Sequence, residues 1–395
     1  MKKWVILSIC LLLIVILSAW LRIVLPYNAV FGSGEVRFLT VDAYAHMRMA
    51  DWCYEHFPSV MKYDAYLTYP DGAVIGARPM FSWIIAALAK GLGTSVDIVG
   101  AWLPPILGIL LLIPVFIIGY MLFNKWAATI SCLFVTIMPG ELIGRTQLGH
   151  ADHDALEIFL MLLTLMFLVL ATKRNWLYSI GAGVSLGLYN LNWVGAPLLT
   201  TILSIYIITQ SIIDKYKGQV NTKLYITFIT TFFLGFLGYI LPTGMRQFLP
   251  TYVILYIAAI ALPAIKLLLL QVLRKSKFYA YLLSLAGITA LGCITIVILS
   301  QLLYDKPILL LTWLYQSFVG AFIPQSSGLG MTISEMMPLL YYRGVFSLDA
   351  AWAYYGMCGV VGLIGLGWLY YKHWSKPEVL LFSIWAIFTI ILTVL

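Results

Sequence analysis

Apolar stretches of about 20 residues recur along this chain. A helix of that length spans the roughly 30 Å hydrocarbon core of a bilayer. Of the 395 residues, 62% are apolar and only 10% are charged, which excludes an ordinary water-soluble domain. The strands of a membrane barrel would give short alternating segments instead. The sequence therefore predicts an all-α fold, a polytopic transmembrane helical bundle.

The length of the apolar runs predicts about eleven membrane-spanning helices in one transmembrane domain that covers residues 1–395. The N-terminal run follows Met1-Lys2-Lys3 and has no small-residue cleavage site, so we expect an uncleaved signal anchor. The predicted spans are 4–26, 97–122, 125–140, 155–172, 176–190, 195–213, 222–241, 250–272, 278–304, 350–371 and 377–395.

Lys and Arg gather in alternate connections between these spans. Such connections face the cytoplasm under the positive-inside rule. Of the 16 acidic residues, all but Asp214 and Glu378 lie at or near the opposite face, which we expect to be outside. The basic inner residues are Lys125, Lys173, Arg174, Lys215, Lys217, Lys223, Arg274, Lys275, Lys277, Lys372 and Lys376.

Two long external loops, 27–96 and 305–349, stand out on the predicted outer face. Loops longer than about 15 residues are usually functional or disordered. The first is rich in Tyr and Trp, and we expect it to pack as short helices on the membrane surface. The second contains IPQSSGLGMTISEMMP (323–338), which predicts a mobile strap. No basic run is long enough to indicate a nucleic-acid partner.

Three acid-bearing stretches fall on this outer face and can converge on one site. They are RFLTVDAYAHMRMADW (37–52), GRTQLGHADHDALE (144–157) and MTISEMMP (331–338). Several carboxylates brought together repel each other unless a divalent cation neutralises them. Oxygen ligands favour Mg²⁺ or Mn²⁺, although His150 and His153 leave the choice open. The expected metal ligands are Asp42, Asp152, Asp154 and Glu335.

Two arginines accompany the acids. Arg48 and Arg145 each lie six or seven residues from an acidic residue. A guanidinium can donate hydrogen bonds to phosphate oxygens of a substrate, or it can hold carboxylates in position. The sequence leaves both roles open.

Other roles also stay open for some of these residues. Asp154 precedes an apolar helix, so it can cap that helix instead of binding a cation. Glu335 can similarly cap a helix that begins near Met336. His46 and His56 are expected to be hydrogen-bonding surface groups and not ligands.

In order and spacing, these motifs resemble those of the oligosaccharyltransferase catalytic subunit of the STT3 type, a GT-C membrane glycosyltransferase. In that family an acid followed by an aromatic residue and an arginine comes after the first helix, as Asp42, Tyr44 and Arg48 do here. An Asp-x-Asp follows an arginine after the third helix, as Asp152-His153-Asp154 follows Arg145. The last external loop carries a motif similar to TISE (332–335). The resemblance covers essentially the whole chain.

The resemblance implies transfer of an oligosaccharide from a polyprenyl phosphate or pyrophosphate carrier to asparagine in an Asn-x-Ser/Thr acceptor polypeptide, with inversion at the sugar carbon. It implies that Asp42, Asp152, Asp154 and Glu335 surround a divalent cation, Mg²⁺ or Mn²⁺. Asp42 and Glu335 would also hydrogen-bond the acceptor amide. Arg145 would be catalytic, Arg48 and Thr332 would bind substrate, and strap 323–338 would close over lipid and peptide. The expected location is a prokaryotic cell membrane, with the site outside.

The chain departs from the family pattern in two places. Its first motif, Thr40-Val41-Asp42, has one acid where some members have two, so Thr40 is at best a weak ligand. No Trp-Trp-Asp motif occurs, although in the family a soluble C-terminal domain carries it and recognises the acceptor Ser/Thr. We therefore expect a fragment that lacks this domain.

Two other functions remain as alternatives. One is a GT-C glycosyltransferase that uses a polyprenyl-phosphate sugar to modify lipid or glycan. The other is a transporter or flippase, which would place its acids at mid-membrane.

Overall fold

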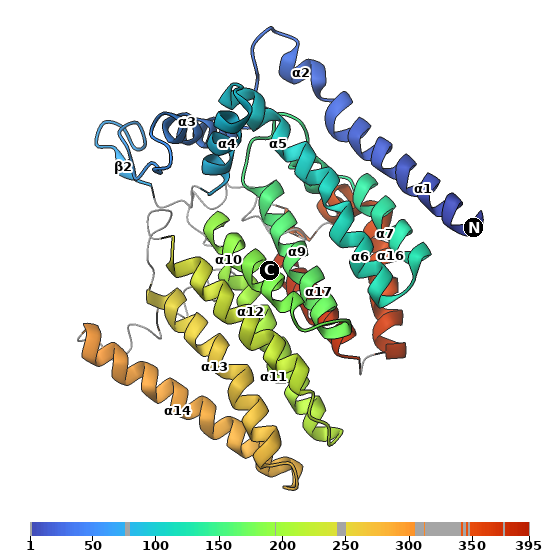
Figure 1. Cartoon of the computed structure of the whole chain (residues 1–395), viewed down its shortest axis with the longest axis vertical. Helices are drawn as coiled ribbons and strands as arrows, with labels where there is room; N and C mark the ends of the chain where they lie inside the picture. The colour runs from blue at the N-terminus through green and yellow to red at the C-terminus, as the bar shows by residue number, and fades with distance from the viewer. Residues whose placement is uncertain are drawn as a thin grey trace. The chain divides into compact units, whose positions relative to one another are not determined.

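The computed structural model describes residues 2–75, 80–193, 195–242, 250–304, 312, 341–342, 345–346, 348–373 and 376–394. Helices dominate this part of the chain (Figure 1). In chain order they are α1 (Lys2–Ala19), the π-helix η1 (Trp20–Val24), α2 (Tyr27–Phe31), α3 (Val41–Glu55), α4 (Met80–Leu92), α5 (Val96–Leu110), α6 (Leu112–Leu122), α7 (Lys125–Ile137), α8 (Glu141–Gly144), α9 (Asp154–Lys173), α10 (Tyr178–Asn192), α11 (Pro197–Tyr216), α12 (Thr222–Ile240), α13 (Pro250–Val272), α14 (Phe278–Tyr304), α16 (Asp349–His373) and α17 (Pro377–Val394).

Every predicted span falls on one of these helices or on a pair of them, which confirms the predicted all-α bundle. The chain is an integral, multi-pass membrane protein. Six helical segments among the described residues have the length and hydropathy to cross a bilayer alone. They are Trp4–Phe31, Val96–Leu122, Asp154–Lys173, Pro197–Tyr216, Thr222–Ile240 and Val253–Val272.

The chain divides into two compact units. One consists of Met1–Leu199 with Thr230–Phe248, and the other of Thr200–Ile229 with Leu249–Leu395. In the first unit α9 packs along α10 and also contacts α5 and α6, while α7 packs against α1 and α6. Glycines let α10 approach the second half of α12, because a Cβ on Gly187 would lie 2.9 Å from the Cα of Gly238.

The first long loop contains the short helices that the sequence predicts. Helices α2, α3 and α4 lie within it, and α3 packs against α4. A small antiparallel hairpin, which the sequence did not reveal, joins β1 (Tyr63–Asp64) to β2 (Ala73–Val74). Among the described residues, the second long loop contains another short hairpin of β3 (Tyr341–Tyr342) and β4 (Val345–Phe346). Glu335, Thr332 and strap 323–338 lie outside the described residues.

Arg22 is a fully buried cation within the first membrane-spanning segment. Helix α7 ends at Ile137, so its last carbonyls have no partner inside the helix. The Arg22 guanidinium donates to two of them, those of Val135 (3.2 Å) and Thr136 (3.3 Å). The negative end of the α7 dipole therefore faces this cation. No carboxylate within the described ranges pairs with it.

The other bonds of Arg22 reach its own helix and the loop before α9. Its Nε donates to the Thr146 hydroxyl at 2.9 Å, and Nη1 donates to the Ser18 hydroxyl at 3.1 Å. The Arg22 carbonyl accepts the backbone N–H of Leu148 at 2.8 Å. One residue therefore joins the first helix, the end of α7 and the loop that carries the second acidic motif.

The second unit has its own buried polar contacts at the ends of its helices. Lys215 of α11 donates to the carbonyls of Leu273 (2.5 Å) and Ser276 (2.8 Å), which follow α13. Asp214 beside it accepts hydrogen bonds from Gln210 at 2.6 Å and from Tyr225 at 2.9 Å. These bonds satisfy the Lys215 ammonium and the Asp214 carboxylate away from water.

Candidate functional site

A glycine turn connects the first and second acidic motifs. Gly149, with a φ of +80°, donates its N–H to the carbonyl of Ala101 in α5 at 3.1 Å. Its carbonyl accepts the N–H of Leu39 at 3.0 Å, two residues before α3 begins. Backbone hydrogen bonds therefore hold the start of α3 beside the loop that leads to Asp152.

Replacing Gly149 by Ala should destabilise the protein strongly. A Cβ there would lie 2.6 Å from Cγ2 of Val30, and the positive φ is unfavourable for alanine. We expect a loss of ~2–4 kcal/mol, measured as a lower unfolding temperature in detergent. Gly144→Ala is the matched control, because a Cβ at Gly144 meets nothing within 4 Å. Equal unfolding temperatures for the two variants would contradict this account.

Asp152 is the centre of the polar cluster. It is 5% exposed, and its Oδ1 accepts the backbone N–H of His153 at 2.6 Å. The same oxygen lies 2.6 Å from Nδ1 of His153 and 3.0 Å from Nε2 of His46. Two histidines from different segments, α3 and the residue preceding α9, therefore converge on one carboxylate oxygen.

The electrostatics of this cluster favour an ionised Asp152. Burial alone would raise the pKa of this carboxyl, but the hydrogen bonds from His153 and His46 hold its pKa well below the ordinary value. Burial opposes the charge on His153 too, yet the bond to Asp152 raises the pKa of His153 to about 9. For His150, burial outweighs the neighbouring carboxylates and lowers the pKa, which favours the neutral imidazole that binds metals.

The raised pKa of His153 predicts a pH-dependent stability. Because the folded pKa of about 9 exceeds the ordinary 6.5, the stabilisation is fully present below about pH 6.5 and is lost as the pH rises through 9. We expect wild type to unfold a few degrees above His153→Gln at pH 6, and the difference to vanish near pH 10. The measurement is the unfolding temperature with a chelator present. A difference that grows with pH would contradict the assignment.

Arg145 holds acidic side chains in position, which is one of the two roles left open by the sequence. Its Nε donates to Glu141 and its Nη1 to Asp154, each at 2.5 Å. Asp154 is the first residue of α9 and not its N-cap, which is His153. The alternative of an Asp154 cap is therefore wrong, although its carboxylate does lie in the first turn, where the helix dipole favours it.

Arg48 lies at the β1–β2 hairpin. Its Nη2 contacts Oδ1 of Asp64 at 2.8 Å, and its guanidinium lies 4.1 Å from the centre of the Tyr66 ring. Asp64 also accepts the backbone N–H of Tyr66 at 2.9 Å. In this structure Arg48 therefore anchors the hairpin to α3.

The start of α3 brings the first acidic motif to the same cluster. Asp42 is exposed in the first turn of α3, and His46 follows one helical turn later on the same face. The prediction of His46 as a surface group is wrong, because its side chain is only 12% exposed and contacts Asp152. The spacing of four residues from Asp42 is the signal that could have revealed it.

Asp152 and Asp154 come together with three histidines, His46, His150 and His153, while Asp42 lies one helical turn before His46 and its place in the site stays a prediction. Ligand atoms of His150, Asp152 and Asp154 lie within 4.8 Å of one another, and so do those of His46, Asp152 and His153. In the described part of the chain, no hydrogen bond reaches the buried Thr40 hydroxyl next to Asp42. The carboxylate oxygens and imidazole nitrogens of these two groups are ligands that fit a divalent cation.

The family model for the N-terminal part of the oligosaccharyl transferase STT3 matches residues 9–394. The chain belongs to the STT3 family. Among its STT3 relatives is the dolichyl-phosphooligosaccharide-protein glycotransferase 3 of Archaeoglobus fulgidus, which is 25% identical over 98% of this chain and 47% of the relative. Glycotransferase 1 of the same organism is 31% identical over 49% of this chain and 32% of its own length.

Solved STT3-type structures share the fold. The archaeal oligosaccharyltransferase AglB from Archaeoglobus fulgidus, in complex with an inhibitory peptide and a dolichol-phosphate, superposes with a TM-score of 0.84 at 23% identity. That match covers 100% of this chain and 48% of the solved one. An Archaeoglobus fulgidus oligosaccharyltransferase in complex with Zn and sulfate gives a TM-score of 0.71 at 22% identity, over 97% and 45% of the two chains. This chain thus spans about half the length of these proteins.

Proposed function

We propose that this chain is the catalytic membrane domain of an oligosaccharyltransferase, which moves a glycan from a polyprenyl phosphate or pyrophosphate carrier to asparagine in Asn-x-Ser/Thr. The observation that carries the proposal is the contact of Asp152 with His46, which lies one helical turn after Asp42 in α3, in a chain of this family. The names of the relatives support the donor class, since they specify dolichyl-phosphooligosaccharides.

Solved relatives support the two substrates. One is in complex with an inhibitory peptide and a dolichol-phosphate, and another is tethered to an acceptor peptide containing the NVT sequon. Another solved relative is in complex with Zn and sulfate, which supports a divalent cation as a ligand. We infer that the acid-rich face of this chain meets the same two classes of ligand, on the outer side of a prokaryotic cell membrane.

His150, Asp152 and Asp154, with Asp42, would hold the divalent cation, and Mg²⁺ or Mn²⁺ fits the carboxylate-rich set. When bound, the cation stabilises the negative charge that develops on the departing phosphate. Asp152 is kept ionised by His46 and His153, and Arg145 fixes the orientation of Asp154. The carboxylates of Asp152 and Asp154 are thus preorganised, and their charges do not need to rearrange during the reaction.

The acceptor amide needs activation, because its nitrogen lone pair is conjugated with the carbonyl. Asp42 is exposed and can accept an N–H of that amide, which favours rotation out of conjugation. Glu335 would accept the second N–H, and Thr332 and Arg48 would contact substrate. We propose that strap 323–338 closes over both substrates and brings Glu335 to the site. Inversion at the sugar carbon follows if the amide nitrogen attacks opposite the departing phosphate.

The proposed function is tested with the purified chain, an Asn-x-Thr peptide and a polyprenyl-linked oligosaccharide donor in detergent or liposomes. We expect glycopeptide that depends on added Mn²⁺ or Mg²⁺ and disappears with an Asn→Gln peptide. Glycosylated lipid with no glycopeptide would instead indicate a transferase acting on lipid. Adding the remaining half of a relative in trans controls for a requirement that lies outside this chain.

A further inference from the structure

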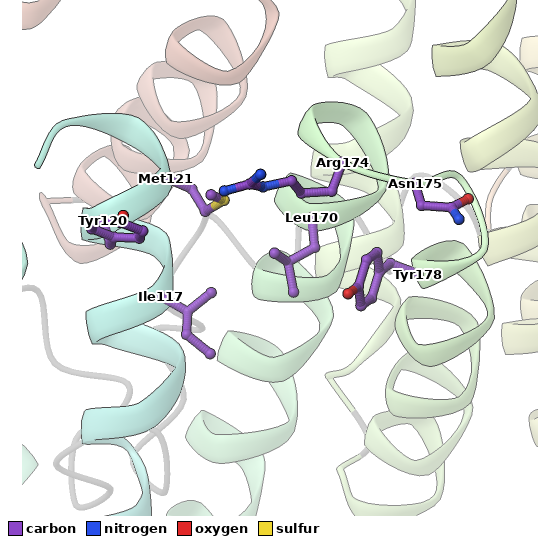
Figure 2. A pocket seen from close by; sticks show the side chains of 7 residues that line it. All are labelled: Ile117, Tyr120, Met121, Leu170, Arg174, Asn175 and Tyr178. Carbon is purple, nitrogen blue, oxygen red and sulfur yellow. The ribbon is translucent and has the colours of Figure 1, made fainter.

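A second polar feature lies at the opposite end of α9 from the acidic cluster. Asp154 begins α9 and Lys173 ends it, and 20 residues of helix span roughly 30 Å. At the Lys173 end, α6, α9 and α10 surround a groove with a volume of about 670 Å³ (Figure 2). Its lining residues are Ile117, Tyr120, Met121, Leu170, Arg174, Asn175 and Tyr178.

The groove has a polar rim and apolar walls. Figure 2 shows the Arg174 side chain extending from the end of α9 toward Met121 of α6, while Asn175 and Tyr178 lie on its other side. Leu170 and Ile117 lie deeper along their helices. Arg174, Asn175 and Tyr178 are exposed residues. Among the residues that the structure describes, no carboxylate lines the groove.

These groups suit an amphiphile with an anionic head. A guanidinium pairs with phosphate through two parallel hydrogen bonds, and the Asn175 amide and the Tyr178 hydroxyl add further donors. The apolar walls below suit an acyl chain. A free anion would use only the rim and would leave the contacts with Ile117 and Leu170 unused.

The location of the groove matches this chemistry. Lys125, Lys173 and Arg174 cluster at this end of the helices, which the positive-inside rule assigns to the cytoplasmic side. Basic pockets between transmembrane helices on that side bind anionic lipid head groups. We propose that the groove between α6, α9 and α10 binds an anionic phospholipid of the inner leaflet, with its phosphate on Arg174 and an acyl chain along Ile117 and Leu170.

Native mass spectrometry of the purified full chain tests the proposal, with phosphatidylglycerol and phosphatidylcholine as probes. We expect wild type to retain phosphatidylglycerol preferentially and to gain thermal stability from it. Arg174→Gln should lower this retention about fivefold or more, and Tyr178→Phe should lower it less. Lys125→Gln is the matched control, because it removes one charge at the same end while its ammonium lies over Trp4, outside the groove.

Three results would overturn the proposal. Arg174→Gln could retain phosphatidylglycerol as wild type does, Lys125→Gln could lose it equally, or excess inorganic phosphate could displace it as readily as a competing lipid does. If Arg174→Gln does not fold, Ile117→Trp gives a second test, because the indole would fill the apolar wall. Unchanged lipid retention in Ile117→Trp would equally refute the assignment.

Discussion

Asp42→Ala is expected to reduce glycan transfer by about 10²- to 10³-fold while leaving the unfolding temperature unchanged. Asp42 is exposed on the α3 face that carries His46, so its removal creates no cavity. It does remove negative charge from the place where the acceptor amide and the cation would meet. The measurement is glycopeptide formation per minute at saturating peptide and Mn²⁺.

Asp51→Ala provides the matched control for this prediction. Asp51 is an exposed acid of the same helix, and nine residues from Asp42 it faces the opposite side of α3. We expect Asp51→Ala to transfer glycan at the wild-type rate. Similar losses in both variants would show that the site depends only on the overall charge of α3 and would refute the role assigned to Asp42.

Arg22→Met should lower both stability and transfer. The substitution leaves the carbonyls of Val135 and Thr136 without their donor and removes the bond to Thr146. We expect a loss of ~3 kcal/mol, because buried carbonyl groups without partners are costly and removing the desolvated cation offsets only part of that cost. Transfer should fall about tenfold or more, because the loop that carries Asp152 loses its contact with the first helix.

Two further variants separate this role from a general effect of charge. Arg22→Lys keeps the cation but can reach fewer of the acceptors, so its unfolding temperature should lie between those of wild type and Arg22→Met. Arg37→Met removes an exposed cation of the same unit and should behave as wild type. Wild-type stability and transfer in Arg22→Met would show that the buried bonds are dispensable.

The membrane-spanning helices could be predicted because a long apolar run has few other stable structures in a bilayer. Their ends were less predictable. The predicted span 125–140 stops at Ile137 in α7, because Met138 precedes Pro139 and has an extended backbone with a ψ of 119°. The carbonyls of Val135 and Thr136 at this helix end then accept hydrogen bonds from Arg22 of a distant helix. Within the sequence, Arg22 gives no sign of burial, because an arginine near the end of a span usually extends toward the interface.

The acidic motifs could be assigned from sequence to one face, but the histidine chemistry around them could not. Asp152 and Asp154 occupy the predicted cluster, while the contact of His46 with Asp152 depends on how α3 packs beside the loop. The hairpin that engages Arg48 is similarly short and lacks a long alternating pattern. The contact of His46 with Asp152 joins segments about 100 residues apart, so only the position of His46 one helical turn after Asp42 hints at it in the sequence.

The turn at Gly149 has a consequence for how sequences of this kind can diverge. Its bonds to Ala101 and Leu39, and the neighbouring bond from Leu148 to Arg22, all use main-chain atoms. Side chains at 101, 39 and 148 can therefore be exchanged for others of similar volume without changing the spacing between the two acidic motifs. Substitution is therefore tolerated around the turn and restricted at the glycine itself, so the geometry of the acid-rich face can be retained while the surrounding side chains differ widely.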